Sequence, residues 1–266
     1  MSTNKDSEAQ YEQVLHDGEE YHSLFDTQAY LKEYYRSDLP HIGYVENRDE
    51  SKLFTYRALS GVKGEMVLDL GSGPSINNHI SAANWFNELI FSDFTASNRE
   101  ALQKWKDGEM DVFDWDPAFK HVAGLEGDEI MWETDKENFR KKMTDIYACD
   151  VRKDNPLHPV ICEPFDCVTS FFCLEQACGD GTDFEQVIKN VSSLLKDGGV
   201  LILGNVLDET RYKIGGVWFR TLGVGKETII KGVEKAGLRD IKWYSCQTPE
   251  VQFSDATDMY VLVARK

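Results

Sequence analysis

A short apolar run that ends in two closely spaced glycines constrains this chain more than any other feature. The residues VLDLGSGPS run from Val67 to Ser75, and the apolar part has the length of one buried strand. Glycines at 71 and 73 allow a sharp turn where the strand ends, because glycine adopts backbone angles that other residues avoid. The stretch predicts a strand over 66–71, a tight turn and then a helix over 75–86.

The same alternation of strand and helix patterns continues along most of the chain. We expect further strands at 88–93, 146–151, 165–174, 200–206, 241–247 and 259–266, and helices at 97–106, 135–144, 182–196 and 226–236. Residues 107–134 predict an irregular stretch, and the pair Gly215-Gly216 between two alternating runs predicts a hairpin over 211–222. This order predicts a mostly parallel sheet with helices on both faces.

The N-terminal part has a different character. Residues 1–20 are polar and predict a flexible N-terminus, whereas FDTQAYLKEYY at 25–35 begins with an acid and a threonine that suit a helix cap. A second helix is expected over 49–60. Because no linker rich in proline or serine divides the chain, we expect a single domain over 21–266 with an N-terminal helical cap.

Charge and composition limit the partners. The formal net charge of −17 opposes binding to nucleic acid, since contact with phosphates draws on basic patches. No apolar stretch approaches the roughly 20 residues of a membrane helix, and the polar start does not resemble a secretory signal. The six cysteines lack metal-binding and redox spacings, which predicts reduced thiols. We expect a cytoplasmic monomer with no metal, membrane or nucleic-acid partner.

The glycine turn predicts a ligand site, because ligands of open parallel sheets bind beyond the carboxyl ends of the strands. A phosphate-binding loop needs a lysine that this turn lacks. A dinucleotide site needs a third glycine where this chain has Ile76, and Pro74 removes one backbone N–H from the turn. A nicotinamide-dependent oxidoreductase is therefore disfavoured and remains an alternative.

S-adenosylmethionine makes different demands, which the residues around the turn meet. It carries no pyrophosphate, and its ribose and methionine tail can lie on a bare glycine backbone. Asp69 is placed to orient the ammonium of the tail, Asp93 to hold the ribose hydroxyls and Asp150 to accept from the adenine amino group. Since the three acids end three successive predicted strands, they favour this cofactor as a set.

Several longer stretches resemble the family of nicotinamide, phenylethanolamine and indolethylamine N-methyltransferases. They are FDTQAYLKEYY, GVKGEMVLDLGSGPS, SDFTASN, FDWDP, CDV, FDCVTSFFCLEQAC, SLLKDGGVLIL and the closing VLVARK. The resemblance implies the α/β, Rossmann-like class I methyltransferase fold, a sheet of seven mostly parallel strands whose last strand is antiparallel. It also implies S-adenosylmethionine as methyl donor and a small amine or pyridine as acceptor.

The resemblance also implies which residues hold the donor. Tyr30 and Tyr35 resemble the tyrosines that close over its methionine end. Asn77 and Phe171 depart from the family's nicotinamide enzyme, which has a tyrosine and a threonine there. The residues expected to bind the donor are Tyr30, Tyr35, Asp69, Gly71, Ser72, Gly73, Asn77, Asp93, Phe94, Asn98, Asp150, Val151 and Phe171.

The acceptor half departs further from the family's pattern. Asn205 stands where the nicotinamide enzyme has an aspartate that contacts the carboxamide, and Thr221 replaces a serine. Glu209 falls where the phenylethanolamine enzyme has an acid that meets the amine, and Asp255 falls near a second acid of that enzyme. The expected acceptor contacts are Asn205, Glu209, Tyr212 and Thr221, and the expected catalytic residues are Glu209, Asp255 and Tyr30.

These acids bear on the kind of acceptor. An aliphatic amine is mostly protonated at neutral pH and must lose a proton before it attacks, whereas a pyridine nitrogen is already neutral. The pair of acids therefore favours an N-methyltransferase that acts on a small amine, with nicotinamide or another pyridine as the alternative. A protein that binds the donor without catalysis is a second alternative, because the donor half matches the family better than the acceptor half.

Overall fold

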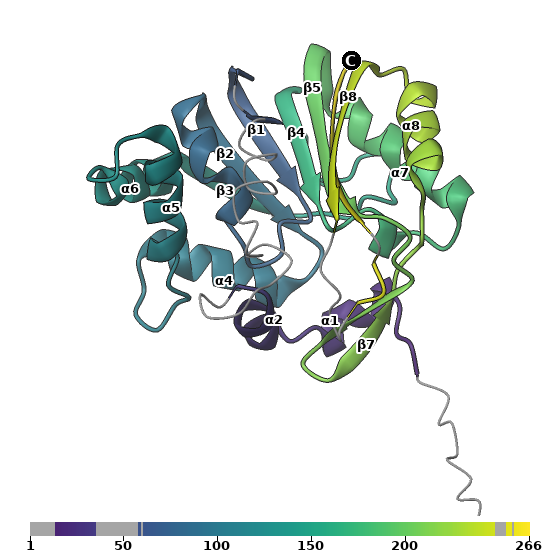
Figure 1. The fold of residues 1–266 in the computed structure, drawn as a ribbon, viewed down its shortest axis with the longest axis horizontal. Coiled ribbons are helices and arrows are strands. Elements are labelled where there is room, and N and C mark those ends of the chain that lie inside the picture. The colour runs from purple at the N-terminus through teal and green to yellow at the C-terminus, as the bar shows by residue number, and fades with distance from the viewer. Residues whose placement is uncertain (1–13, 36–57, 60, 248–253, 257) are drawn as a thin grey trace, which may run out of the picture.

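The computed structural model describes residues 14–35, 58–59, 61–247, 254–256 and 258–266 (Figure 1). Seven strands form one sheet: β1 (Gly64–Leu70), β2 (Phe86–Asp93), β3 (Met143–Ala148), β4 (Phe165–Phe171), β5 (Leu195–Val206), β8 (Arg239–Gln247) and β9 (Asp258–Arg265). Their order is β3-β2-β1-β4-β5-β9-β8. Strands β1 to β5 are parallel, and β9 runs antiparallel between β5 and β8. The predicted mostly parallel sheet with an antiparallel last strand is confirmed.

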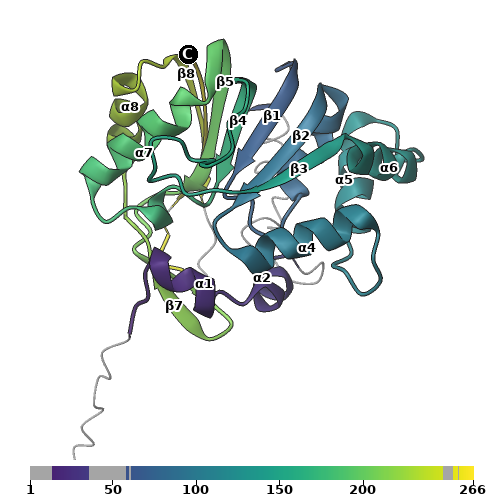
Figure 2. The same ribbon diagram turned by 180° about the vertical axis from the view of Figure 1, so that it is seen from behind.

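Helices cover both faces of this sheet, as expected (Figures 1 and 2). One face carries α4 (Ala96–Asp107), α5 (Asp116–Glu126) and α6 (Trp132–Lys142), and the other carries α7 (Gly181–Ser193) and α8 (Lys226–Lys235). Because neighbouring strand residues point to opposite faces, Val67 is buried in the first core and Leu68 in the second. The strand at the glycine turn is thus buried on both sides, which holds the turn firmly.

Several predicted elements differ from those in the structure; for example, β5 begins at Leu195 rather than at the predicted residue 200. The segment 107–134, expected to be irregular, contains α5, whose first turn holds Pro117 and whose end is marked by Gly127 with a φ of 79°. Proline suits a first turn, since the N–H that it lacks would have no partner there. Residues 75–86 form the 3₁₀ helix η2 (Asn77–Asn84), and β3 begins at Met143, so Asp150 lies two residues beyond that strand.

The N-terminal cap lies below the carboxyl edge of the sheet, together with the predicted hairpin β6 (Arg211–Ile214) and β7 (Val217–Arg220) (Figure 1). It contains η1 (Gly18–Glu20), α1 (Tyr21–Leu24) and α2 (Thr27–Tyr34). Asp26 caps α2 by accepting hydrogen bonds from the backbone N–H groups of Gln28 (3.0 Å) and Ala29 (2.9 Å). The acid-and-threonine start therefore marks this helix, as predicted.

Two sets of contacts tie the cap to the rest of the domain. Thr27 donates a hydrogen bond to Asn98 Oδ1 at 2.7 Å, which joins α2 to α4. The backbone of His16 donates to Trp218 at 3.0 Å and accepts from Arg220 at 2.8 Å, which joins the start of the described chain to β7. Residues 1–13 and most of the helix expected over 49–60 lie outside the described residues.

Candidate functional site

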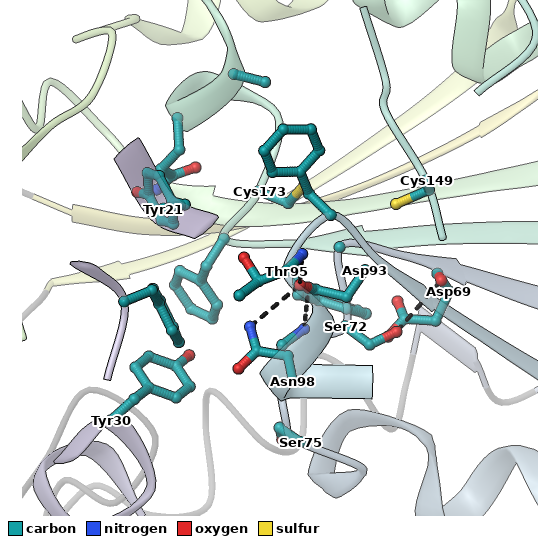
Figure 3. Close-up of a pocket in the computed structure, with 18 of the residues that line it drawn as sticks. Tyr21, Tyr30, Asp69, Ser72, Ser75, Asp93, Thr95, Asn98, Cys149 and Cys173 are labelled. Carbon is teal, nitrogen blue, oxygen red and sulfur yellow. Dashed lines mark hydrogen bonds between the residues drawn. The ribbon is translucent and has the colours of Figure 1, made fainter. Parts of the chain in front are cut away.

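A cavity lies between the carboxyl ends of the central strands and the N-terminal cap (Figure 3). All the residues that the sequence predicts for the donor line it, so strands, turns and cap converge on one space. Glu209 and Tyr212, predicted for the acceptor, line the same cavity. Their roles in binding stay predictions.

The glycine turn leaves its backbone bare toward the cavity. Gly71 and Gly73 have φ angles of 70° and 58°, which favour glycine, and a Cβ on Gly71 would lie 2.0 Å from the sulfur of Cys173. The backbone N–H of Ser72 donates to the carbonyl of Ser92 at 2.9 Å, which fixes the turn against β2. A side chain at position 71 would therefore disturb both the backbone and its neighbour.

Asp93 is a buried carboxylate that the turn and α4 hold in place. It accepts hydrogen bonds from the N–H of Gly73 at 2.7 Å, and from the N–H of Thr95 (2.8 Å) and the side-chain amide of Asn98 (3.1 Å), both labelled in Figure 3. Burial raises its pKa, and these donors oppose the rise. A carboxylate accepts about four hydrogen bonds, so one position remains for a hydroxyl of a ligand. A bare glycine backbone beside such an acceptor fits S-adenosylmethionine.

Asp69 lies beside the turn with 4% of its surface exposed. The hydroxyl of Thr169 donates to its Oδ1 at 2.7 Å. Burial raises the pKa of Asp69, while the neighbouring His79, Thr169 and Ser72 lower it. The carboxylate is therefore held from the side of β4 and faces the cavity next to the glycines.

Aromatic side chains of the cap close the cavity from below. Tyr30 stacks on Tyr34 at 4.9 Å between ring centroids and meets the edge of Tyr35 at 5.7 Å. The hydroxyl of Tyr34 donates to the carbonyl of Lys213 in the hairpin at 3.0 Å. Burial raises the pKa of all three phenols, so they stay neutral hydrogen-bond donors. Together they form an aromatic wall of the cavity.

Arg152 is a cavity-lining cation that the sequence analysis missed. Its guanidinium holds Asp150 through Nε to Oδ1 (2.8 Å) and Nη2 to Oδ2 (3.1 Å), and Nη1 reaches Glu19 in the cap at 2.5 Å. Partial burial raises the pKa of Asp150, but the Arg152 contacts outweigh it and lower that pKa. The same guanidinium lies 5.4 Å from the ring centre of Phe94. The sequence feature that could have identified Arg152 is its place two residues after the predicted acid, Asp150.

Glu209 is a buried ionisable group in the part of the cavity where we expect the acceptor. Only 7% of its surface is exposed, and the hydroxyl of Ser254 donates to its Oε1 at 2.5 Å. Burial raises the pKa of Glu209 to about 7, with the charges of Asp255 and Glu175 acting in the same direction and Ser254 opposing. A carboxyl with this pKa can accept a proton near neutral pH and release it again.

Asn205 does not line the cavity. It is 2% exposed, its amide group donates to Glu175, and its own carbonyl oxygen accepts from the N–H of Val206 at 2.8 Å. Glu175, which the sequence analysis missed, also accepts from the hydroxyl of Tyr260 at 2.9 Å, and burial raises its pKa. The sequence feature that could have identified Glu175 is an acid within the stretch LEQAC, which is otherwise without charge. The predicted contact of Asn205 with the acceptor is thus replaced by contacts within the domain.

Thr221 and Asp255 also lie away from the cavity wall. The N–H of Thr221 donates to the carbonyl of Thr210 at 3.0 Å, and the residue is 6% exposed. Asp255 accepts from the N–H of Thr210 (2.8 Å) and from its hydroxyl (2.6 Å), and faces Arg211 at 3.8 Å. These donors lower its pKa although burial opposes them. Asp255 is therefore tied to the loop before the hairpin, and Glu209 alone of the two acids faces the cavity.

Other kinds of site find little support in the described part of the chain. Within it, no three His, Cys, Asp or Glu side chains come together as a metal ion would require. No described helix has the length and apolar character to cross a membrane. Cys149, Cys162, Cys167, Cys173 and Cys178 are free thiols.

Comparison with known proteins identifies the relatives of this chain. The model of the NNMT/PNMT/TEMT family matches residues 12–266. Human nicotinamide N-methyltransferase is 34% identical over 250 residues, which cover 92% of this chain and 94% of that protein. Mouse indolethylamine N-methyltransferase is 32% identical over 258 residues (94% and 96%), and human phenylethanolamine N-methyltransferase is 28% identical over 230 residues (83% and 80%).

Solved structures agree on the fold. Magnesium protoporphyrin IX methyltransferase from Synechocystis PCC 6803, with bound SAM, superposes with a TM-score of 0.56 at 12% identity, covering 93% of this chain and 94% of that one. The N-methyltransferase NodS from Bradyrhizobium japonicum WM9, in complex with S-adenosyl-L-homocysteine, gives 0.53 at 17% identity, covering 90% and 97%. The predicted class I methyltransferase fold is confirmed.

Proposed function

The chain belongs to the NNMT/PNMT/TEMT family of S-adenosylmethionine-dependent small-molecule N-methyltransferases, and on that basis we propose that its acceptor is a small amine that Glu209 deprotonates. The observation that carries the proposal is a buried carboxyl with a pKa of about 7 in the cavity that also holds the predicted donor residues. S-adenosylmethionine supplies a methyl group on a positively charged sulfur.

The donor end of the cavity binds and orients. The bare backbone at Gly71 and Gly73 would hold the ribose and the methionine tail, Asp93 would accept from a ribose hydroxyl, and Asp69 would hold the ammonium of the tail. Tyr30 and Tyr35 exclude water from the methionine end. Correct alignment of two reacting groups can supply about 7–11 kcal/mol, so this positioning is the largest contribution that we assign to the protein.

The acceptor end handles the proton. An ammonium that enters the cavity must give up a proton before its nitrogen has a free electron pair, and Glu209 is the carboxyl placed to take it. General bases work best when their pKa lies near the working pH, a condition that Glu209 meets. Tyr212 and Tyr34 line the same space and offer aromatic faces to the positive charge that arrives on nitrogen.

A pyridine acceptor such as nicotinamide is the rival within the same family. A pyridine needs no base, and the aspartate expected at the end of β5 to hold a carboxamide is Asn205 in this chain. Asn205 donates its amide to Glu175 and is not among the residues that line the cavity, so it is not placed to replace that contact. These observations favour the amine.

Turnover of an acceptor panel with labelled S-adenosylmethionine tests the proposal. The panel holds primary aryl-alkyl amines, secondary amines, and pyridines that include nicotinamide. We expect methylation of one or more amines, and a loss of about 100-fold or more in kcat/KM for the amine in Glu209→Gln. Methylation of nicotinamide alone, or of no acceptor at all despite tight donor binding, contradicts the amine assignment.

A cytoplasmic, monomeric state is part of the same proposal. The free thiols fit a reducing compartment, where disulfides rarely persist. Light scattering of the purified full chain measures the oligomeric state, and a stable dimer contradicts the monomer.

A further inference from the structure

His79 is a buried histidine in the wall of the donor cavity, on η2. It is 2% exposed, and its ring meets Phe91 and Phe171 edge-on, at 5.4 Å and 5.9 Å between centroids. Its Nε2 lies 2.7 Å from the hydroxyl of Thr169 and 3.4 Å from Oδ1 of Asp69. Burying a polar ring between two phenylalanines is costly unless the ring makes hydrogen bonds. The polar neighbours of His79 are Thr169 and the carboxylate of Asp69 in the cavity wall.

The hydrogen bonds fix where the protons lie. An ionised carboxylate only accepts, so the hydroxyl of Thr169 donates its one hydrogen to Asp69 Oδ1 at 2.7 Å. That hydroxyl must then accept from His79 at 2.7 Å, which places the ring proton on Nε2. Burial lowers the pKa of His79, and the neighbouring Asp69 opposes this shift, so the ring is neutral at neutral pH. The result is a chain of donors that runs from His79 through Thr169 to Asp69.

We propose that His79 and Thr169 are positioning residues that hold the Asp69 carboxylate toward the cavity and thereby set the affinity for the amino-acid end of the donor. The inference rests on the proposed role of Asp69 toward the donor's ammonium. The two residues come from different sides of Asp69, since Thr169 lies on β4, next to β1, and His79 lies beyond the glycine turn. Thr169 donates to Oδ1 and is itself held by His79, so the carboxylate cannot rotate without breaking the hydrogen bond from Thr169.

Calorimetric binding of two ligands tests this inference without any turnover. S-adenosylhomocysteine carries the amino-acid end, and 5′-methylthioadenosine shares the nucleoside and the sulfur but lacks that end. We expect His79→Leu and Thr169→Val each to weaken S-adenosylhomocysteine by about 10-fold, the worth of one lost hydrogen bond. Affinity for 5′-methylthioadenosine should stay within about twofold. Equal weakening of both ligands, or of neither, overturns the proposal.

Two further variants separate positioning from stability. His79→Gln keeps an N–H donor and is expected to recover most of the affinity lost in His79→Leu. Ser170→Ala removes a neighbouring buried hydroxyl that donates to the carbonyl of Leu70 at 2.8 Å, so it should lower the melting temperature without changing the ratio of the two affinities. If Ser170→Ala changes that ratio as much as Thr169→Val does, the effect is structural and the proposal fails.

Asp69→Asn tests the premise separately. We expect it to weaken S-adenosylhomocysteine and to spare 5′-methylthioadenosine. If it affects neither ligand, the role of Asp69 fails. If it discriminates between them while the His79 and Thr169 variants do not, the positioning inference fails and the proposed function stands.

Discussion

Replacing Glu209 by glutamine tests both the energetic cost and the chemistry of this buried carboxyl. Its pKa in the folded protein is about 7, against an ordinary value of 4.5. One pKa unit corresponds to about 1.4 kcal/mol, so the difference of about 2.5 makes ionised Glu209 destabilise the fold by about 3 kcal/mol. A raised pKa means that the folded state holds this proton more tightly than the unfolded state does. The contribution of Glu209 to the free energy of unfolding therefore falls as the pH rises from 4.5 to about 7.

Glu209→Gln is neutral at every pH and lacks this dependence. We expect its free energy of unfolding to exceed that of the parent by as much as about 3 kcal/mol above pH 7, and the two proteins to converge toward about pH 4.5. Urea unfolding at several pH values measures this difference. The hydroxyl of Ser254 still finds an acceptor in the glutamine carbonyl, so that donor keeps its partner.

Activity should move in the opposite direction. For an aliphatic amine, kcat/KM of the parent is expected to rise about tenfold per pH unit below the pKa of Glu209 and to level off above it, because only the ionised carboxyl removes the proton. Glu209→Gln should lose about 10²–10⁴-fold with that amine. Ser254→Ala removes a donor that lowers the pKa of Glu209, so the midpoint of the profile should shift upward.

A matched substitution guards the interpretation. Glu185 is an acid on α7 that pairs with Lys235 at 2.6 Å on the surface, and Glu185→Gln should leave the pH profile as it is. A parent profile that is flat between about pH 5.5 and 8, or an amine turnover in Glu209→Gln within threefold of the parent, refutes the assignment of Glu209 as base.

Three further substitutions test other parts of the structure. Gly71→Ala places a Cβ against Cys173 at a positive φ, so it should lower the free energy of unfolding by about 2 kcal/mol or more and weaken donor binding. Gly61 also has a positive φ, but no atom lies within 4 Å of its added Cβ, so Gly61→Ala should cost only the backbone strain. Equal losses in both variants would contradict the steric argument. Arg152→Leu removes the link between Glu19 in the cap and Asp150, which follows β3. Stopped-flow measurement should show S-adenosylhomocysteine dissociating about three- to fivefold faster, and an unchanged rate would contradict a role of this link in retaining the ligand. Asp166 accepts hydrogen bonds from two backbone N–H groups of β1 and from the ammonium of Lys196, which lower its pKa although burial opposes them. Its contribution to the free energy of unfolding is therefore complete above pH 3.8 and is lost as the pH falls through the lowered pKa. Asp166→Asn should cost about 1–2 kcal/mol in urea unfolding at neutral pH, and no cost would contradict these hydrogen bonds.

The donor half of the site follows from local sequence because the fold itself brings strand ends together. In a parallel sheet, residues that follow successive strands meet at one edge, so a turn after β1 and an acid after β2 lie close whatever the loops do. Gly73 donates its N–H to Asp93 for this reason, and Asp150 lines the same cavity even though the strand predicted before it was displaced by three residues. The place of Asp93 in the site could thus be predicted without knowledge of tertiary contacts.

The acceptor half depends on contacts between distant segments, which no local pattern encodes. Asn205 was expected to face a ligand, but Glu175, 30 residues earlier, takes its amide group. Asp255 was expected to act on a substrate, but the loop at Thr210 supplies closer donors. In both cases the polar group pairs with a protein partner, and for the buried Asn205 leaving that partner unsatisfied would be costly. Glu209 escapes such pairing except for one hydroxyl, and its high pKa follows from that.

Carboxylates stand at both ends of the path along which positive charge moves, from the donor sulfur to the acceptor nitrogen. Asp69 and Asp93 lie at the donor end and Glu209 at the acceptor end, while the cavity-lining Arg152 is already paired with acids. An acidic cavity stabilises a cation before and after transfer, so its field aids binding more than it lowers the barrier. What changes along the path is the proton on the acceptor nitrogen, and Glu209, with a pKa of about 7, is suited to take it. The choice between an amine and a pyridine therefore depends on this one proton transfer, which is why the effect of Glu209→Gln should differ between the two kinds of acceptor.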